Sequence, residues 1–264
     1  MIETFTDTIE IQNAQALDAM QRQFRQMETG FGIVSDIDET IVDTVGRHVG
    51  FVTRAAQLAG FKGALPTLEE IKAAGGTADY ARVFGMTPDE WEEVMIRVRE
   101  RRFVNEKADL YHQDTVQTLM NGGELLGFLT AKPGTDRTLA ATQKDLIHRL
   151  GFPEKPVILR PNSVPLSQTS DWKIEMLAAI KGTSPKGIVL VDDSLSTARV
   201  IAGHNQQAGN IGIMQIVYKG PLTAPALESG KFIPDESLGI YAADWEEMPA
   251  VFDRIREQCH NTQN

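Results

Sequence analysis

The sequence predicts an α/β fold with a Rossmann-like parallel-sheet core and a small inserted α-helical domain. Short apolar runs that end in polar residues, the pattern of strands buried in a parallel sheet, alternate with segments of helical periodicity. One long interval interrupts this alternation and contains helical patterns alone. We therefore assign residues 1–44 and 111–264 to the core and residues 45–110 to the helical insertion.

The elements of the core follow from this alternation in chain order. Apolar residues recur at mostly three- and four-residue spacing, which predicts an amphipathic N-terminal helix that can bury against the core or a partner: Ile11, Leu17, Met20, Phe24 and Met27. Strands are expected at residues 31–35, 125–129, 156–159, 188–191, 211–217 and 238–241. Helices are expected at residues 138–150, 170–180 and 195–202, and in a last segment that carries Trp245, Phe252 and Ile255.

The insertion is predicted to be helical because it has helical patterns and no clear strand. The tetrapeptide TPDE at residues 87–90 reads as a capping box with proline at the first helical position. Trp91, Val94, Met95 and Val98 form an apolar stripe behind it. A helix is therefore expected to begin at this box.

The bulk composition limits the class of protein. The net charge of −10 disfavours a large surface for nucleic acid or anionic lipid. No apolar run approaches the length needed to span a bilayer, and the acidic N-terminus has no secretion signal. The single cysteine, Cys259, allows no internal disulfide. We expect a cytoplasmic protein of unknown oligomeric state that binds neither nucleic acid nor membrane.

Polar residues gather where the predicted parallel strands end, which is the edge at which open α/β sheets build ligand sites. Several carboxylates that converge there repel one another unless a cation neutralises them, and a site of oxygen ligands suits Mg²⁺. The residues concerned are Asp36 and Asp38 after the first strand, Thr130 after the second, Lys173 at a helix start, and Asp192 and Asp193 after the fourth strand.

These residue types also fit phosphoryl transfer. A carboxylate such as Asp36 can attack phosphorus and form an aspartyl-phosphate. A second carboxylate two residues on, Asp38, can protonate the leaving oxygen and then deprotonate a water. Thr130 and Lys173 can supply a hydroxyl and an ammonium to the phosphoryl oxygens.

The motifs resemble those of the haloacid dehalogenase-like (HAD) superfamily. FGIVSDIDET at residues 31–40 looks like its first motif and LLGFLTAKP at residues 125–133 like its second. Lys173 looks like the third motif and IVLVDDS at residues 188–194 like the fourth. All four occur in the family's order, and with the linking elements the resemblance covers nearly the whole chain.

The resemblance implies a role for each matching residue. Asp36 would be the nucleophile and a magnesium ligand, and Asp38 the general acid and base with its backbone carbonyl on the metal. Asp193 would be the main metal ligand of the fourth motif, with Asp192 bound directly or through water. Thr40 would hold the turn after the first motif. The phosphoryl group would be bound by Thr130 and by Lys173, for which Lys181 and Lys186 are alternatives.

The resemblance further implies that residues 45–110 form a helical cap that closes over the site and selects the substrate. Candidate contacts for specificity are Arg47, His48 and Lys132. The expected function is Mg²⁺-dependent hydrolysis of a small phosphorylated metabolite, a phosphate monoester, through an aspartyl-phosphate. Asp38 argues against dehalogenation, because the dehalogenase branch has no aspartate at that position.

The sequence is also compatible with other functions. A phosphomutase needs the same core, and a phosphonate hydrolase would need a cap lysine, for which Lys62 and Lys72 are available. A receiver-type signalling domain uses similar residues in another order, and it has no place for the inserted cap. An inactive binding protein on the same fold has no support, because none of the motif positions is substituted.

Overall fold

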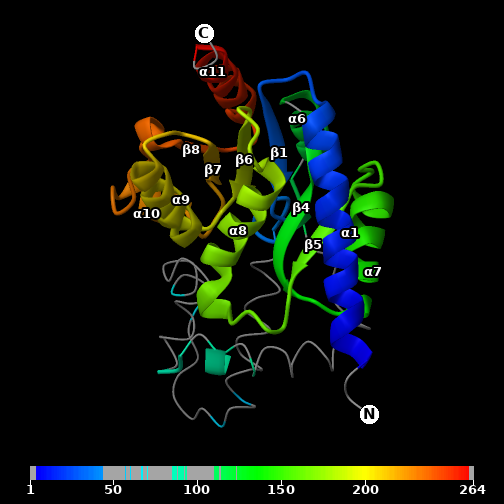
Figure 1. Ribbon diagram of the computed structural model, residues 1–264. Helices are drawn as coiled ribbons and strands as arrows, with labels where there is room; N and C mark the ends of the chain where they lie inside the picture. Colours follow the sequence, from blue (N-terminus) through cyan, green and yellow to red (C-terminus); the bar gives the residue numbers. More distant parts are fainter. Residues whose placement is uncertain are drawn as a thin grey trace.

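The computed structural model (Figure 1) describes residues 4–43, 110–112, 114–122 and 124–261, together with positions 57, 60, 67, 70, 85–87, 89–91 and 93. Its core is a six-stranded sheet with the order β5-β4-β1-β6-β7-β8. All neighbouring strands in it are parallel, as the sequence predicts. The strands are β1 (Phe31–Ser35), β4 (Glu124–Pro133), β5 (Val157–Arg160), β6 (Gly187–Asp192), β7 (Ile213–Tyr218) and β8 (Ile240–Ala243).

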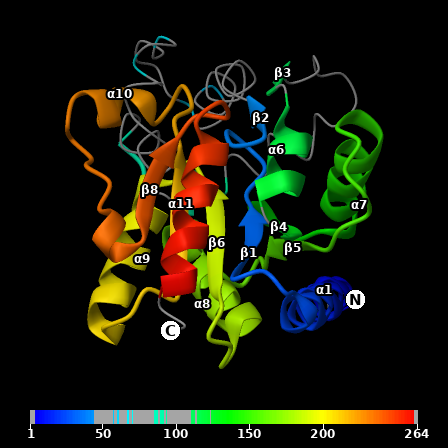
Figure 2. The same ribbon diagram turned by 90° about the horizontal axis from the view of Figure 1, so that it is seen from above.

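Helices cover both faces of the sheet. Figure 1 shows α1 (Thr4–Gln26), α8 (Thr169–Lys181) and α9 (Leu195–Ala208) in front of it. Figure 2 shows α11 (Met248–Asn261) and α6 (Thr115–Gly122) over the opposite face, with α7 (Asp136–Lys144) and its π-helical extension (Asp145–Arg149) beside them. Two apolar clusters result, because alternate residues of a strand point to opposite faces: Phe31 and Ile33 belong to one cluster and Val34 to the other. None of the helices in the described ranges is long and apolar enough to cross a membrane.

The N-terminal helix α1 packs against the core. Met20 and Phe24 are fully buried, whereas Ile11, which the spacing assigned to the same apolar stripe, is 57% exposed. Gly127 of β4 makes this close approach possible, since a Cβ at that position would lie 2.4 Å from the Met20 methyl carbon. The Asn13 side chain donates to the Leu159 carbonyl (2.7 Å) and accepts from the Leu159 N–H (3.1 Å), so α1 also satisfies the outer edge of β5.

Four short elements were not expected from the sequence. The strands β2 (Val42–Asp43) and β3 (Leu110–Tyr111) form a separate antiparallel pair. They pair the described residues on either side of the insertion, Asp43 with Leu110 and Val42 with Tyr111. The short helix α6 was also missed, and a further short helix, α10 (Ala224–Glu228), follows β7.

The predicted capping box is present. The Thr87 N–H donates to Oε2 of Glu90 (2.8 Å), and the Glu90 N–H donates to Oγ1 of Thr87 (3.2 Å). Trp91 behind it is fully buried, as its place in the apolar stripe predicts. Most of the insertion, including Arg47 and His48, lies outside the described residues.

The strand order reverses beside β1. The chain builds β4 and β5 on one side of β1 and then crosses through α8 to build β6, β7 and β8 on the other side. Open α/β sheets bind ligands where the order reverses in this way, beyond the carboxyl ends of the strands. Asp36 follows β1 and Asp192 ends β6 at this point.

Candidate active site

The segment after β1 is held in a tight turn. The Asp36 N–H donates to the Val191 carbonyl (2.8 Å), which continues the pairing between β1 and β6. Glu39 has a φ of 60°, in the left-handed region that few side chains adopt. Its N–H donates to the Val42 carbonyl (2.7 Å) and closes the turn. Asp36 therefore lies on an ordered segment, with its side chain turned into a buried environment.

The segment after β6 brings two more carboxylates to the same place. Asp36, Asp192 and Asp193 each present an oxygen, and these three atoms lie within 4.8 Å of one another. Thr40 joins the two segments, because its Oγ1 accepts a hydrogen bond from the Asp193 N–H (3.1 Å). The structure thus places Asp36, Asp192 and Asp193 together; we call them the carboxylate cluster. It gives Thr40 a cross-link beyond the local turn expected from sequence.

Lys173 supplies the positive charge beside the carboxylate cluster. Its Nζ donates to Oδ2 of Asp192 (2.7 Å) and lies 3.5 Å from Oδ2 of Asp36. Both alternative lysines lie elsewhere: Lys181 donates to the Ser184 carbonyl, and Lys186 to carbonyls at the end of α1. Of the three lysines considered, Lys173 is the one that contacts the cluster.

Asp38 and Lys132 form a second polar pair nearby. Lys132 Nζ lies 3.0 Å from Oδ1 of Asp38, and both side chains are partly exposed. Thr130 is buried on β4, the neighbour of β1, and its Oγ1 accepts a long hydrogen bond (3.4 Å) from the Lys132 N–H. Lys132 was expected at the entrance of the site, and the structure places its ammonium on the carboxylate predicted to move protons.

The charges of the cluster are not balanced by Lys173 alone. The pKa of Asp36 is raised to about 7: burial is the main cause, Lys173 acts to lower it, and the charges of Asp192 and Asp38 act to raise it. Burial also raises the pKa of Asp193 well above its usual range, with added repulsion from Asp192 and Asp36. Burial acts to lower the pKa of Lys173, but the charges of Asp192 and Asp36 outweigh it and raise the pKa above its ordinary value.

A divalent cation fits this arrangement. The Oδ1 atom of Asp36 is buried and accepts no hydrogen bond from the described residues, so this oxygen is available as a ligand. The three carboxylates of the cluster offer oxygen ligands, which hard cations such as Mg²⁺ prefer. A bound cation would relieve the repulsion that raises the pKa values of Asp36 and Asp193.

Sequence reasoning missed two side chains behind these segments. Trp245 was expected within the last helix, but it precedes α11, and its Nε1–H donates to the Thr40 carbonyl (3.2 Å). Gln215 of β7 donates from Nε2 to the Asp192 and Ser194 carbonyls. For Gln215 a signal was available: it is the one polar residue inside the otherwise apolar run IMQIV at residues 213–217.

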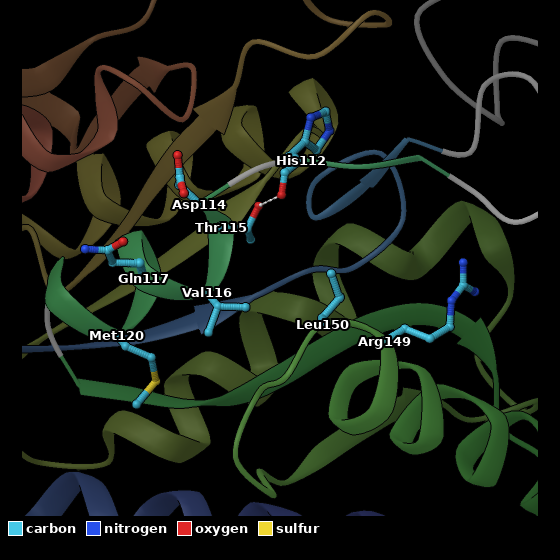
Figure 3. A pocket seen from close by; sticks show the side chains of 8 residues that line it. All are labelled: His112, Asp114, Thr115, Val116, Gln117, Met120, Arg149 and Leu150. Carbon is cyan, nitrogen blue, oxygen red and sulfur yellow. Dashed lines mark hydrogen bonds between the residues drawn. The ribbon is translucent and has the colours of Figure 1, made fainter.

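A groove of about 390 Å³ lies elsewhere, between α6 and the end of the π-helical turn (Figure 3). Figure 3 shows its lining side chains and the hydrogen bond from the Thr115 hydroxyl to the His112 carbonyl (2.9 Å). The lining residues include none of the carboxylate cluster. The groove is therefore separate from the carboxylate cluster at the sheet edge, which is the candidate active site.

Comparison with known proteins bears on the fold. No protein-family model matches the chain, and no curated protein matches it significantly. Among solved structures, it is similar to a protein described as a haloacid dehalogenase-like hydrolase from Bacteroides fragilis, with a TM-score of 0.52 and 16% identity over 82% of this chain and 98% of that one. It is also similar to a hydrolase from Pseudomonas syringae, with a TM-score of 0.49 and 11% identity over 84% of this chain and 98% of that one. At 16% identity, the similarity to the Bacteroides fragilis protein shows a common fold and nothing further. This chain has the fold of the haloacid dehalogenase-like hydrolases.

Proposed function

We propose that this chain is a Mg²⁺-dependent phosphatase that hydrolyses a small phosphate monoester through an aspartyl-phosphate on Asp36. One observation carries the proposal. Asp36, Asp192 and Asp193 converge at the sheet edge with Lys173 against two of them, and Asp38 stands two residues beyond Asp36. This set combines a nucleophile, a proton carrier and a cation site.

In the first step, an oxygen of Asp36 attacks the phosphorus of the substrate. The new Asp36 O–P bond forms as the bond from phosphorus to the leaving oxygen breaks, and Asp38 gives its proton to that oxygen. Lys173, 3.5 Å from Oδ2 of Asp36, orients the carboxylate and can contact a phosphoryl oxygen as negative charge spreads over the group. The hydroxyl of Thr130 would donate to another phosphoryl oxygen.

In the second step, Asp38 acts as a base. It takes a proton from a water, the water oxygen attacks phosphorus, and the bond to Asp36 breaks to release phosphate. Lys132 lies 3.0 Å from Oδ1 of Asp38 and holds this carboxylate in one orientation while it gives and takes the proton. The same carboxylate thus serves both steps.

The cation would be held by Asp36, Asp193 and the Asp38 backbone carbonyl, with Asp192 bound directly or through water. When bound, Mg²⁺ supplies charge that neutralises the phosphoryl oxygens and lets the anionic substrate approach the carboxylates. The net charge of −10 makes such a local cation necessary, because the overall field repels a phosphate ester.

We place substrate choice in the inserted segment 45–110, with Arg47 and His48 as contacts to a phosphorylated metabolite. Both residues closely follow the turn that carries Asp36 and Asp38. Replacing either should weaken turnover of the physiological substrate and leave turnover of a simple aryl phosphate unchanged. A panel of metabolite phosphates identifies the substrate on which this comparison is made.

Release of 4-nitrophenol from 4-nitrophenyl phosphate tests the proposed function. The wild type should be active with Mg²⁺ and inactive with EDTA. Asp36→Asn, which keeps the shape but not the nucleophile, should lose about a thousandfold or more in rate. Asp253→Asn, at an aspartate of α11 whose side chain is 71% exposed, is the matched control and should retain full activity. Activity in Asp36→Asn or in EDTA would refute the proposal.

A further inference from the structure

Gln215 is a buried polar side chain in the middle of the sheet. It lies on β7, beside Leu190 of β6, and its side chain is fully buried. Its other neighbours along β7, Met214 and Ile216, are buried apolar residues of the core. A side chain that must leave water to occupy this position costs stability unless its polar atoms are satisfied.

The Gln215 side chain satisfies only one of its ends. Its Nε2 donates to the carbonyl of Asp192 (3.2 Å) and to the carbonyl of Ser194 (3.1 Å). Because both neighbours are carbonyl oxygens, the amide group must turn its NH₂ toward them. Its Oε1 is buried and accepts no hydrogen bond from the described residues. An apolar residue of this size would avoid the cost of burying an oxygen without a donor. We therefore ask what the two donated hydrogen bonds stabilise.

The two carbonyls flank Asp193. The hydrogen bonds from Gln215 hold the carbonyls of the residues before and after Asp193. The Asp193 N–H is held in turn by Oγ1 of Thr40 (3.1 Å). The Ser194 N–H donates to Oδ1 of Asp192 (3.1 Å), which ties the second carboxylate to the same segment. Gln215 therefore holds the segment 192–194 from inside the sheet, and Thr40 holds it from the side of β1.

We propose that Gln215 is a positioning residue for the cation site, which it preorganises by fixing the backbone around Asp193. The cation in this inference rests on the proposed function, whereas the fixing of the backbone by Gln215 is independent of it. Hydrogen bonds that hold a metal ligand in place typically change metal affinity by tenfold or more when they are removed.

Asn205 provides a matched control within the same molecule. It is buried like Gln215, its Nδ2 also donates to two carbonyls, those of Ile213 and Leu238, and its Oδ1 accepts no hydrogen bond from the described residues. The Ile213 carbonyl lies at the start of β7 and the Leu238 carbonyl just before β8, both at the opposite edge of the sheet from the cluster. The chemistry is the same and the location differs, so any effect of Gln215 that Asn205 does not share is an effect on the site.

The test compares Gln215→Met with Asn205→Leu. Each variant replaces the amide by an apolar side chain of similar size and removes two hydrogen bonds to backbone carbonyls. Gln215→Met should raise the dissociation constant for Mg²⁺, measured by calorimetry, by about tenfold, and Asn205→Leu should change it by less than about twofold. Gln215→Leu serves as a second variant if the methionine variant does not fold.

Hydrogen exchange of the Asp193 and Ser194 backbone amides in EDTA separates the two proposals. Exchange should be faster in Gln215→Met than in the wild type and unchanged in Asn205→Leu. Unchanged exchange in Gln215→Met, or equal Mg²⁺ affinities of this variant and the wild type, would overturn the role of Gln215. A wild type that binds no Mg²⁺ would instead overturn the proposed function, and the exchange measurement would still decide whether Gln215 fixes the segment.

Discussion

The ammonium group of Lys132 lies 3.0 Å from Oδ1 of Asp38. Lys132 comes from β4 and Asp38 from the turn after β1, so the contact joins two neighbouring strands at the edge where the carboxylate cluster lies. In the proposed mechanism Asp38 gives a proton in one step and takes one in the next, and an ammonium in this position would restrict the orientation of its carboxylate.

Lys132→Met removes this contact but keeps the aliphatic stem. We expect kcat with 4-nitrophenyl phosphate to fall by about tenfold, because general acid–base catalysis requires a positioned group. The free energy of unfolding should change by about 1 kcal/mol or less, since pairs this exposed contribute little stability. Lys132→Arg should restore part of the rate. A full rate in Lys132→Met would show that the contact has no part in catalysis.

Lys173→Met should both abolish activity and destabilise the protein. The ammonium and the Asp192 carboxylate are both buried, so its removal leaves a charge without its partner. Such a change typically costs about 3–5 kcal/mol of folding free energy, which urea unfolding measures. Lys181→Met is the control, because that ammonium donates to the Ser184 carbonyl outside the cluster. Equal effects of the two substitutions would contradict the role given to Lys173.

Asp36→Asn should stabilise the metal-free protein. Burial, the main cause, raises the pKa of Asp36 to about 7, so the folded state binds this proton more tightly than the unfolded state does. Stability contributed by the protonated form is therefore lost as the pH rises from about 4 through about 7. In EDTA above this range, Asp36→Asn should melt several degrees higher than the wild type. Thermal unfolding at several pH values checks this, and a lower melting temperature for the variant would contradict it.

Asn13→Ala should lower stability without affecting catalysis. The Asn13 amide satisfies both backbone groups of Leu159 on the edge strand β5, and its loss leaves them without those hydrogen bonds. We expect a cost of about 1–3 kcal/mol in the free energy of unfolding and an unchanged kcat. Gln15→Ala, at an exposed position of the same helix, is the control and should cost far less.

The core could be predicted from the sequence because its strands carry a strong signal. Strands buried on both faces, such as β1 and β6, read as continuous apolar runs, and their polar ends mark the edge of the sheet. The two-residue strands β2 and β3 are too short to show any periodicity. The helix α6 has only Val116 and Leu119 as branched apolar residues, a pattern too sparse to identify it.

The candidate site was predictable in its residue types and only partly in its contacts. Motif order alone predicted Asp36, Asp38, Asp192 and Asp193. Three lysines fitted the third motif, and only the structure shows which of them contacts the cluster. The bond from Trp245 to Thr40 spans 205 residues, which local patterns do not encode. Positions such as Gln215, where an apolar run contains one polar residue, are where a sequence reveals that a side chain has a task besides packing.

The central claim, a phosphoryl group carried on Asp36, is tested most directly with Asp38→Asn and 4-nitrophenyl phosphate. Nitrophenolate leaves readily without a proton, so Asp36 should still be phosphorylated, whereas the second step should stall because no base activates the water. With Mg²⁺ we expect a burst of one equivalent of nitrophenolate, and peptide mass spectrometry should find one phosphoryl group on Asp36. Turnover without a burst, or a phosphoryl group on any other residue, would contradict the mechanism.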